Sequence, residues 1–282
     1  ILTLLNIIEI SLPINKSYMD LSKIKMVVTD MDGTLLNSNH QVSDHFFDLF
    51  KSLKSQGIIF VAASGRQYNS IIDKLDSIKD DIIVIAENGG FAMKQNTELL
   101  ATPLEQQHVN DILKALNQIP NIHPVLCGKH KAYLTGKSNE FISKLAEYYT
   151  EFEIIDDLSS FESEVIKIAI YHFESSEQHI YPFVKHFEGD LKVKVSGENW
   201  LDISNSNAHK GYALEKVMKS YNLKSDEVMV FGDYNNDLEM LALSDYGFAM
   251  ENAHPNVKKA AKYSTLSNDE NGVEHILKML IK

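Results

Sequence analysis

The residues best suited to chemistry form four short clusters along the chain. They occupy residues 30–35 (DMDGTL), 64–66 (SGR), 210–211 (KG) and 232–237 (GDYNND). In the first cluster, the carboxylates of Asp30 and Asp32 are two residues apart, so they point to the same side of an extended segment. Gly33 allows a turn that can aim backbone N–H groups at an anion. The first cluster therefore predicts carboxylate chemistry beside an anion site.

The other three clusters add hydroxyl, ammonium and carboxylate groups. The hydroxyl of Ser64 and the N–H groups of a following helix can bind an anion, although Ser-Gly before a helix is usually only a cap. Lys210 can supply a point charge to a phosphate, although a lysine at a helix start is normally solvated. Asp233 and Asp237 offer the hard oxygen ligands that Mg²⁺ prefers, although such a segment is also a common turn.

Each cluster lies at the end or the start of an element that can position it. Short apolar runs over residues 24–29, 58–63 and 228–231 predict buried strands, and three of the clusters follow them. Lys210 opens a segment with apolar residues at helical spacing, residues 210–221. Because ligands bind beyond the carboxyl ends of parallel strands, we expect the four clusters to converge on one crevice.

The alternation of elements predicts two modules. Apolar strands separated by amphipathic helices flank the middle of the chain and predict an α/β core with a parallel sheet, formed by residues 23–91 and 199–282. Between them, strands that alternate apolar and polar residues predict an inserted α+β module over residues 92–198, with an antiparallel sheet and helices on one face. We expect the hinges near Gly89-Gly90 and Ser196-Gly197.

The N-terminal segment is expected to lie outside the fold. Residues 1–12 are apolar but carry Asn6 and Glu9, without the basic region or the cleavage site of a signal peptide. Met19 is a plausible natural start, directly before the first predicted strand. We therefore assign residues 1–22 to an extension. No stretch of 18 apolar residues predicts a membrane span.

Charge and cysteine content restrict the partners and the compartment. The 282 residues carry a formal net charge of −12, which gives no electrostatic support for nucleic-acid binding. Cys127 is the single cysteine and cannot form an internal disulfide, in keeping with a reducing compartment. We therefore expect a cytoplasmic protein with no nucleic-acid or membrane partner.

Together the clusters resemble the haloacid dehalogenase superfamily, in its Cof-type subfamily IIB of sugar and metabolite phosphatases. Two further segments add to the resemblance: ENGG at residues 87–90, and GDYNNDLEM, which extends the fourth cluster to residue 240. The resemblance covers residues 24–282. It implies a Rossmann-like parallel core with an inserted C2-type α+β cap.

The resemblance also implies a role for each matching residue. Asp30 would be the nucleophile that forms an aspartyl-phosphate, and Asp32 the general acid and base. The groups that bind the phosphoryl oxygens would be the backbone N–H groups of Met31 and Gly65, the hydroxyl of Ser64, and the side chains of Lys210 and Asn236. The ligands of Mg²⁺ would be Asp30, the backbone carbonyl of Asp32, and Asp233. The supporting residues would be Asp237, Thr34, Arg66 and Asn88.

The function implied is a Mg²⁺-dependent phosphomonoester hydrolase for small phosphorylated metabolites such as sugar phosphates. Asp32 can protonate a leaving alkoxide only if its pKa is raised, and we expect neighbouring carboxylates to raise it. A phosphomutase of the same superfamily, or a metal-binding regulatory protein without turnover, are the alternatives. Candidates for the rim of the substrate site are Tyr133 and the turn at residues 129–131. The sequence indicates neither the substrate nor the oligomeric state.

Overall fold

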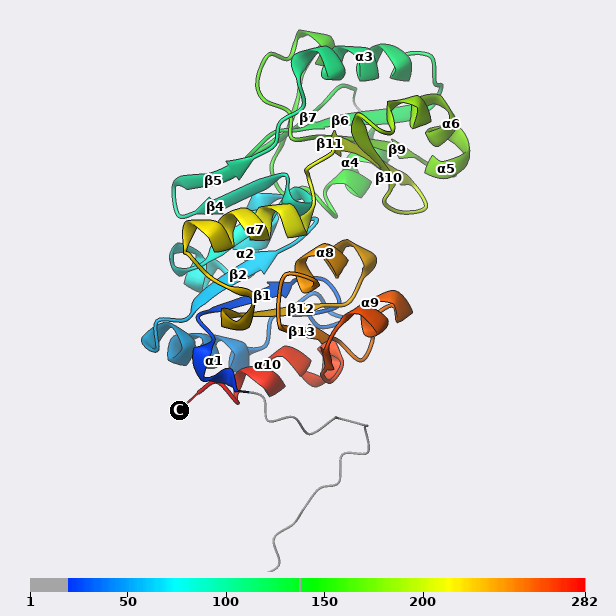
Figure 1. Ribbon diagram of the computed structural model, residues 1–282. Helices are drawn as coiled ribbons and strands as arrows, with labels where there is room; N and C mark the ends of the chain where they lie inside the picture. The colour runs from blue at the N-terminus through cyan, green and yellow to red at the C-terminus, as the bar shows by residue number, and fades with distance from the viewer. Residues whose placement is uncertain (1–19, 137, 282) are drawn as a thin grey trace, which may run out of the picture.

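The computed structural model describes residues 20–136 and 138–281, whose strands form two sheets (Figure 1). The larger sheet has the order β14-β13-β12-β1-β2-β3-β4-β5. Its strands are β1 (Met26–Asp30), β2 (Ile59–Ala63), β3 (Ile83–Ala86), β4 (Phe91–Lys94), β5 (Thr97–Ala101), β12 (Val228–Gly232), β13 (Tyr246–Ala249) and β14 (Tyr263–Ser264). Strands β14 to β3 pair in parallel, whereas β4 and β5 are added antiparallel at the edge.

Helices cover both faces of this sheet, as expected for a parallel sheet. They are α1 (Asp44–Ser55), α2 (Tyr68–Lys74), α7 (Lys210–Ser220), α8 (Leu238–Leu241), α9 (Pro255–Ala260) and α10 (Gly272–Leu277). Figure 1 shows α1 beside α10 on one side of the sheet and α7 beside α8 on the other. Every residue of β1 is buried, which explains why its first three residues are all apolar rather than alternating.

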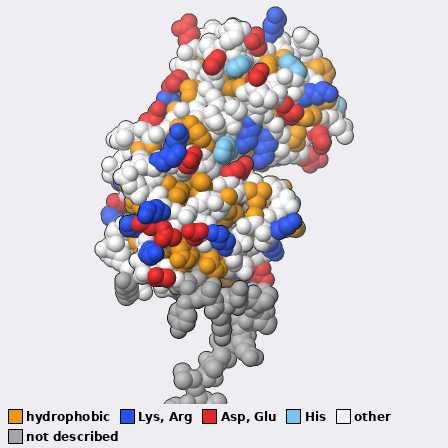
Figure 2. Space-filling view, viewed as in Figure 1, with side chains coloured by type: hydrophobic (Ala, Val, Ile, Leu, Met, Phe, Trp, Pro, Cys, Tyr) orange, Lys and Arg blue, Asp and Glu red, His pale blue; other side chains and the backbone are white. Residues whose placement is uncertain are grey.

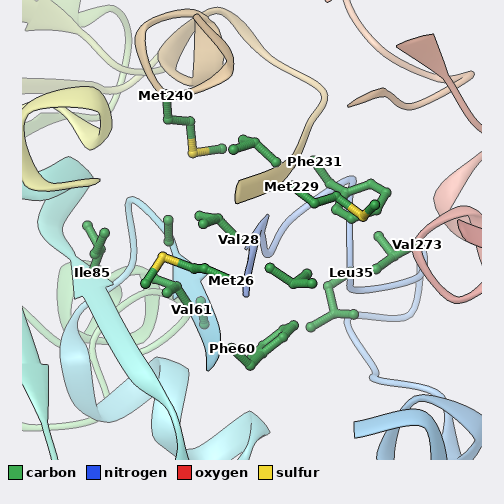
Figure 3. Close-up of a cluster of buried hydrophobic side chains, with 14 of the residues drawn as sticks. Met26, Val28, Leu35, Phe60, Val61, Ile85, Met229, Phe231, Met240 and Val273 are labelled. Carbon is green, nitrogen blue, oxygen red and sulfur yellow. The ribbon is translucent and has the colours of Figure 1, made fainter. Parts of the chain in front are cut away.

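The core between the layers is packed with aromatic, methionine and branched side chains. Phe60 of β2 lies 5.1 Å from Phe46 of α1, measured between ring centroids. Figure 3 shows Met26, Val28 and Phe231 from neighbouring central strands within the same buried cluster. This packing fixes the central strands, and therefore fixes the positions of the residues that follow their carboxyl ends.

The second sheet belongs to the inserted module and has the order β10-β11-β9-β6-β7-β8. Its strands are β6 (Ile122–Cys127), β7 (Ala132–Leu134), β8 (Phe152–Ile154), β9 (Lys167–His172), β10 (Leu191–Val195) and β11 (Trp200–Asn205). The helices of this module are α3 (Gln106–Leu116), α4 (Asn139–Leu145), α5 (Ser176–His179) and α6 (Tyr181–Val184). Neighbouring strands pair antiparallel except β7 and β8, which pair in parallel.

Helices pack on both faces of this second sheet, so the expectation of helices on one face is wrong. Ile168 and Ile170 of β9 join a cluster with α3 and α6. The alternate residues Ala169 and Tyr171 join a different cluster with Phe141 of α4. The reason is that β9 is apolar on both faces, so each face needs a cover.

The expected module boundaries must also be moved. Strands β4 and β5 pair with the core sheet, so the inserted module begins after residue 101 rather than at 92. Strand β11 pairs with β9 and β10, so the inserted module extends to residue 205 rather than 198. Ser196-Gly197 lies in the turn between β10 and β11, and Gly89-Gly90 lies before β4. Neither expected hinge is therefore a crossing point. The chain enters the inserted module after β5, which belongs to the core sheet, and leaves it after β11, which belongs to the second sheet. Below, the inserted module means residues 102–205, and the core module means the remaining described residues.

The assignment of residues 1–22 to an extension is wrong at its end. Leu21 packs against the main core, and the backbone carbonyl of Asp20 accepts a hydrogen bond from the hydroxyl of Tyr246 at 2.8 Å. The core reaches these residues because Tyr246, the first residue of β13, bonds to them. Residues 1–19 lie outside the described part of the chain. Within the described part, every helix is too short or too polar to cross a bilayer.

Candidate active site

The carboxyl ends of β1, β2 and β12 open into a cavity of about 1220 Å³ between the two modules. Asp30, Ser64 and Asn236 line it from the core module, and Tyr148 and Trp200 line it from the inserted module. Figure 2 shows the notch that separates the two modules on one side of the molecule. Three of the four clusters therefore line one crevice, as expected, whereas Lys210 of the remaining cluster is fully buried and reaches the site through Asp30.

A buried lysine between two carboxylates lies at the base of the cavity. The Nζ atom of Lys210 donates to Oδ1 of Asp30 at 2.5 Å and to Oδ1 of Asp237 at 2.7 Å. Burial disfavours the ammonium, but the carboxylates of Asp237 and Asp30 raise the pKa of Lys210 above its usual value, so the side chain is charged. Lys210 reaches this position because it is the first residue of α7, whose start is capped by His209.

The pKa of Asp30 lies well above its usual value. Burial is the largest cause, Lys210 opposes it, and the carboxylates of Asp237 and Asp233 add to the rise. One ammonium therefore does not compensate three neighbouring carboxylates. An additional cation here would favour the ionised form of Asp30, which is the form that a nucleophile needs.

The loop after β12 holds Asp233 against the loop after β1. Oδ1 of Asp233 accepts a hydrogen bond from the hydroxyl of Thr34 at 3.0 Å. A Cβ atom on Gly33 would lie 2.4 Å from Oδ2 of Asp233, and φ at this glycine is +77°, so no other residue fits without displacing the carboxylate. Oδ2 of Asp237 accepts the N–H groups of Asp233 and Tyr234 at 3.0 and 3.1 Å. Asp237 therefore stabilises this loop with one carboxylate oxygen and bonds to Lys210 with the other.

The acidic cluster fits a hard divalent cation. Asp30, Asp233 and Asp237 each offer a ligand atom within 4.8 Å of the others. Both oxygens of Asp237 already accept hydrogen bonds from the protein, whereas Asp30 and Asp233 keep acceptor capacity toward the cavity. Carboxylate oxygens are ligands of the kind that Mg²⁺ takes. Asp30 and Asp233 are thus the side chains best placed to hold the ion, and the carbonyl of Asp32 stays a prediction.

The side chain of Asp32 turns away from this cluster and pairs with Arg66. Nε and Nη2 of Arg66 donate to the two carboxylate oxygens at 2.7 and 2.6 Å, and Nδ1 of His40 lies 3.4 Å from Oδ1. Burial raises the pKa of Asp32, but the hydrogen bonds and charge of Arg66, with a smaller contribution from His40, lower it below its usual value. The expectation of a raised pKa is therefore wrong for this arrangement, because the nearest charged group is a guanidinium rather than a carboxylate.

A hydrogen-bonded turn connects the second cluster to the fourth. The N–H of Asn88 donates to the carbonyl of Ser64 at 2.9 Å, and Nδ2 of Asn236 donates to Oδ1 of Asn88 at 2.9 Å. A Cβ atom on Gly65 would lie 3.0 Å from Nδ2 of Asn88, so this glycine lets the amide group approach the backbone closely. Ser64, Gly65, Asn88 and Asn236 all line the cavity. The side chain of Met31 is fully buried.

The comparisons with known proteins agree with this geometry. The family model of the haloacid dehalogenase-like hydrolases matches residues 27–277. This chain belongs to that family. A phosphatase of Escherichia coli K12 named for 5-amino-6-(5-phospho-D-ribitylamino)uracil, YbjI, is 31% identical over 262 residues, which are 92% of this chain and 97% of that protein.

Solved structures extend the comparison to the whole fold of this hydrolase. The crystal structure of TM0651 from Thermotoga maritima superposes with a TM-score of 0.83 and 27% identity, covering 91% of this chain and 97% of that one. The haloacid dehalogenase subclass IIB sugar phosphatase BT4131 shares the fold with a TM-score of 0.76 and 21% identity, covering 90% and 98% of the two chains. The expected family and the α/β fold are therefore confirmed.

Sequence reasoning missed the part of this hydrolase's cavity that the inserted module supplies. The aromatic lining residues there are Tyr148, Tyr149, Tyr171 and Trp200, and the charged ones include Lys144, Lys167, Lys194 and Asp202. The sequence shows Tyr148 and Tyr149 as an adjacent pair, but Tyr171 and Trp200 lie on separate strands, so no local pattern connects the four. The expected rim residues, Tyr133 and the turn at 129–131, line a separate pocket of about 290 Å³ instead.

Proposed function

We propose that this hydrolase is a Mg²⁺-dependent phosphatase that releases phosphate from small phosphorylated metabolites through an aspartyl-phosphate on Asp30. The observation that carries the proposal is the position of Asp30: it is buried at the carboxyl end of β1, bonded to Lys210, next to Asp233, and open to the cavity. A carboxylate nucleophile divides a difficult hydrolysis into two easier displacements.

Charge neutralisation is the main requirement for this reaction, since an anionic nucleophile must approach an anionic phosphoryl group. Lys210 supplies a fixed positive charge on one side of Asp30. The hydroxyl of Ser64, the N–H groups of Met31 and Gly65, and the amide of Asn236 would hold the phosphoryl oxygens. Mg²⁺ bound by Asp30, Asp233 and the carbonyl of Asp32 would neutralise charge on the transferring group.

Proton transfer is assigned to Asp32, which lines the same cavity. As a carboxylic acid it would protonate the leaving oxygen, and as a carboxylate it would accept a proton from the attacking water. Its pairing with Arg66 stabilises the carboxylate, so the arrangement in the structure suits the second, hydrolytic half of the reaction. For the first half, Arg66 has to release Asp32, and an anionic substrate entering the cavity offers the guanidinium another partner.

The lining of the inserted module supports a sugar-like leaving group. The side chain of Tyr148 remains 51% exposed although it lines the cavity, and its ring lies 5.9 Å from that of Trp200. Exposed aromatic rings in a cavity suit the apolar faces of a sugar, or a planar ring attached to it. Phosphorylated sugars, sugar alcohols and 5-amino-6-(5-phospho-D-ribitylamino)uracil, the compound in the name of the relative from E. coli, are therefore the substrates to test.

The test compares the parent protein with Asp30→Asn in a screen of these phosphates with Mg²⁺, run in ¹⁸O-labelled water. The parent should release phosphate that carries the label, whereas a mutase would return unlabelled phosphoryl groups to the sugar. Asp30→Asn should lose turnover by more than 10³-fold while its circular dichroism is unchanged, because the amide cannot form the acyl phosphate. Asp48→Asn, on the exposed surface of α1, is the control and should behave like the parent. Activity of Asp30→Asn within tenfold of the parent would contradict the proposal.

A further inference from the structure

The two modules of this hydrolase approach each other closely beside the turn Glu87–Gly89, at the edge of the active-site cavity. A Cβ atom on Gly90 would lie only 2.5 Å from Cγ2 of Ile166, so the core backbone fits against the inserted module because this residue is glycine. The next residue of the inserted module, Lys167, begins β9. Its side chain therefore enters the space between the modules.

Lys167 forms a buried ion pair across the junction. Its Nζ atom lies 2.8 Å from Oε2 of Glu87 in the core module, and the two side chains are 8% and 2% exposed. The same Nζ atom lies 3.6 Å from Oδ2 of Asp202 on β11, and 5.9 Å from the ring centroid of Tyr149. The pairing of β9 with β11 sets Asp202 opposite Ala169, which places it diagonally from Lys167 on one face of the sheet.

This group of charges is incompletely bonded within the protein. An ammonium has three N–H donors, and Glu87 and Asp202 are the acidic groups near Lys167 in the described chain, with Asp202 beyond hydrogen-bond distance. Lys167 and Asp202 both line the cavity that contains Asp30, whereas Glu87 does not. A buried charged group with unused donors favours a further polar partner. Since two of these residues face the cavity, a molecule bound there can supply that partner.

We propose that Lys167 and Asp202 bind adjacent hydroxyl groups of the substrate's leaving group, and that Glu87 fixes Lys167 in the orientation this requires. A hydroxyl can accept a hydrogen bond from the ammonium and donate one to the carboxylate, so a donor and an acceptor less than 4 Å apart suit a 1,2-diol. A polyol or sugar phosphate would satisfy both groups, whereas an alkyl phosphate would leave them desolvated and unpaired. The assignment rests on the proposed phosphatase activity and adds the residues that select its substrate.

A second lysine of the inserted module provides a matched control. Lys129 also reaches the core module, where its Nζ lies 2.8 Å from Oε2 of Glu98, and it is 2.5 Å from Oε2 of Glu164. It lines the small separate pocket rather than the active-site cavity. Removing Lys129 therefore breaks an ion pair between the modules without removing a group that faces the substrate.

The experiment measures kcat/KM for D-ribitol 5-phosphate and for n-pentyl phosphate, which has the same chain length but lacks the hydroxyl groups. The ratio of the two values reports recognition of the hydroxyls. In Lys167→Met and in Asp202→Asn the ratio should fall by about 10- to 100-fold, because a site built to bond a hydroxyl discriminates strongly against its absence. Lys129→Met should keep the ratio of the parent within twofold.

Lys167→Met leaves the carboxylate of Glu87 buried without its partner, so the double variant Lys167→Met/Glu87→Gln is made in parallel to restore charge balance. It should fold like the parent and should still lose the discrimination. A folded double variant with the parent's ratio would overturn the assignment, as would an equal loss for both esters in every Lys167 and Asp202 variant. A parent protein that hydrolyses neither ester nor any other phosphate would instead refute the proposed function, and the substrate assignment with it.

Discussion

Replacing Lys210 by methionine tests the charge balance of the site without any assumption about turnover. The side chain is fully buried between Asp30 and Asp237, at 2.5 and 2.7 Å. Methionine has a similar volume, so the change removes the charge and leaves two buried carboxylates without their shared partner. Removing one member of a buried ion pair typically costs about 3–5 kcal/mol of the free energy of unfolding.

The matched control is Lys219→Met on the same helix. Lys219 pairs with Glu215 at 2.8 Å, but its side chain is 66% exposed, so the loss should stay below about 1 kcal/mol. Both variants are unfolded with urea at pH 7.5 and followed by circular dichroism. A double variant, Lys210→Met/Asp237→Asn, removes one of the orphaned charges and should recover part of the lost stability.

The pH dependence sharpens this test. Without Lys210, burial raises the pKa of Asp30 even further, so the folded state binds a proton that the unfolded state has released. A folded-state pKa above the unfolded value makes stability fall as pH rises, so the cost of Lys210→Met should be larger at pH 8 than at pH 5. A loss below 1 kcal/mol at pH 7.5, or a loss equal to that of Lys219→Met, would refute the claim that Lys210 balances the buried carboxylates.

Three further predictions concern the groups around the nucleophile. Asp32→Asn should slow release from alkyl phosphates by about 10²–10⁴-fold and from an activated aryl phosphate less, and equal losses in single-turnover experiments would count against its role as an acid. Arg66→Met removes the hydrogen bonds that lower the pKa of Asp32, so the Cγ resonance of that residue should titrate at a higher pH than in the parent, and an unchanged midpoint would contradict the pairing. Chelation of Mg²⁺ should abolish phosphate release and lower the unfolding temperature, because the repulsion between Asp30 and Asp233 returns, and activity that persists in EDTA would exclude the metal requirement.

The sequence was sufficient to predict the centre of the site, because local rules place Asp30, Asp233 and Lys210. Asp30 and Asp233 directly follow apolar strands, and the carboxyl ends of parallel strands lie at one edge of a sheet. Lys210 opens a helix that the same sheet positions. Their convergence therefore needed no knowledge of individual contacts, only the order of the elements.

The remainder depends on contacts between distant segments, which no local pattern encodes. Glu87 belongs to a motif visible in the sequence, but its partner Lys167 lies 80 residues later on another sheet, in a strand that reads as half-buried. The pKa of Asp32 was predicted with the wrong sign because Arg66, 34 residues away, comes closer to it than any carboxylate does. The module boundaries were predicted wrongly for a similar reason. The hairpin of β4 and β5 could extend either sheet, and only its pairing with β3 shows that it belongs to the core sheet.

The turn Glu87–Gly89 shows how the two modules can act on one substrate. Its residues Glu87, Asn88 and Gly89 have φ values of +50°, +54° and +95°, so three consecutive residues adopt a left-handed conformation that is costly outside glycine. Such a turn persists only because its surroundings hold it: Asn88 contacts Ser64 and Asn236, and Glu87 contacts Lys167. The same rigid segment thus touches the groups assigned to the phosphoryl oxygens and the lysine assigned to the leaving group. Under the assignments proposed above, one turn would hold both the groups that bind the phosphoryl oxygens and the lysine that binds the leaving group, so recognition by the inserted module would contribute to positioning for the displacement.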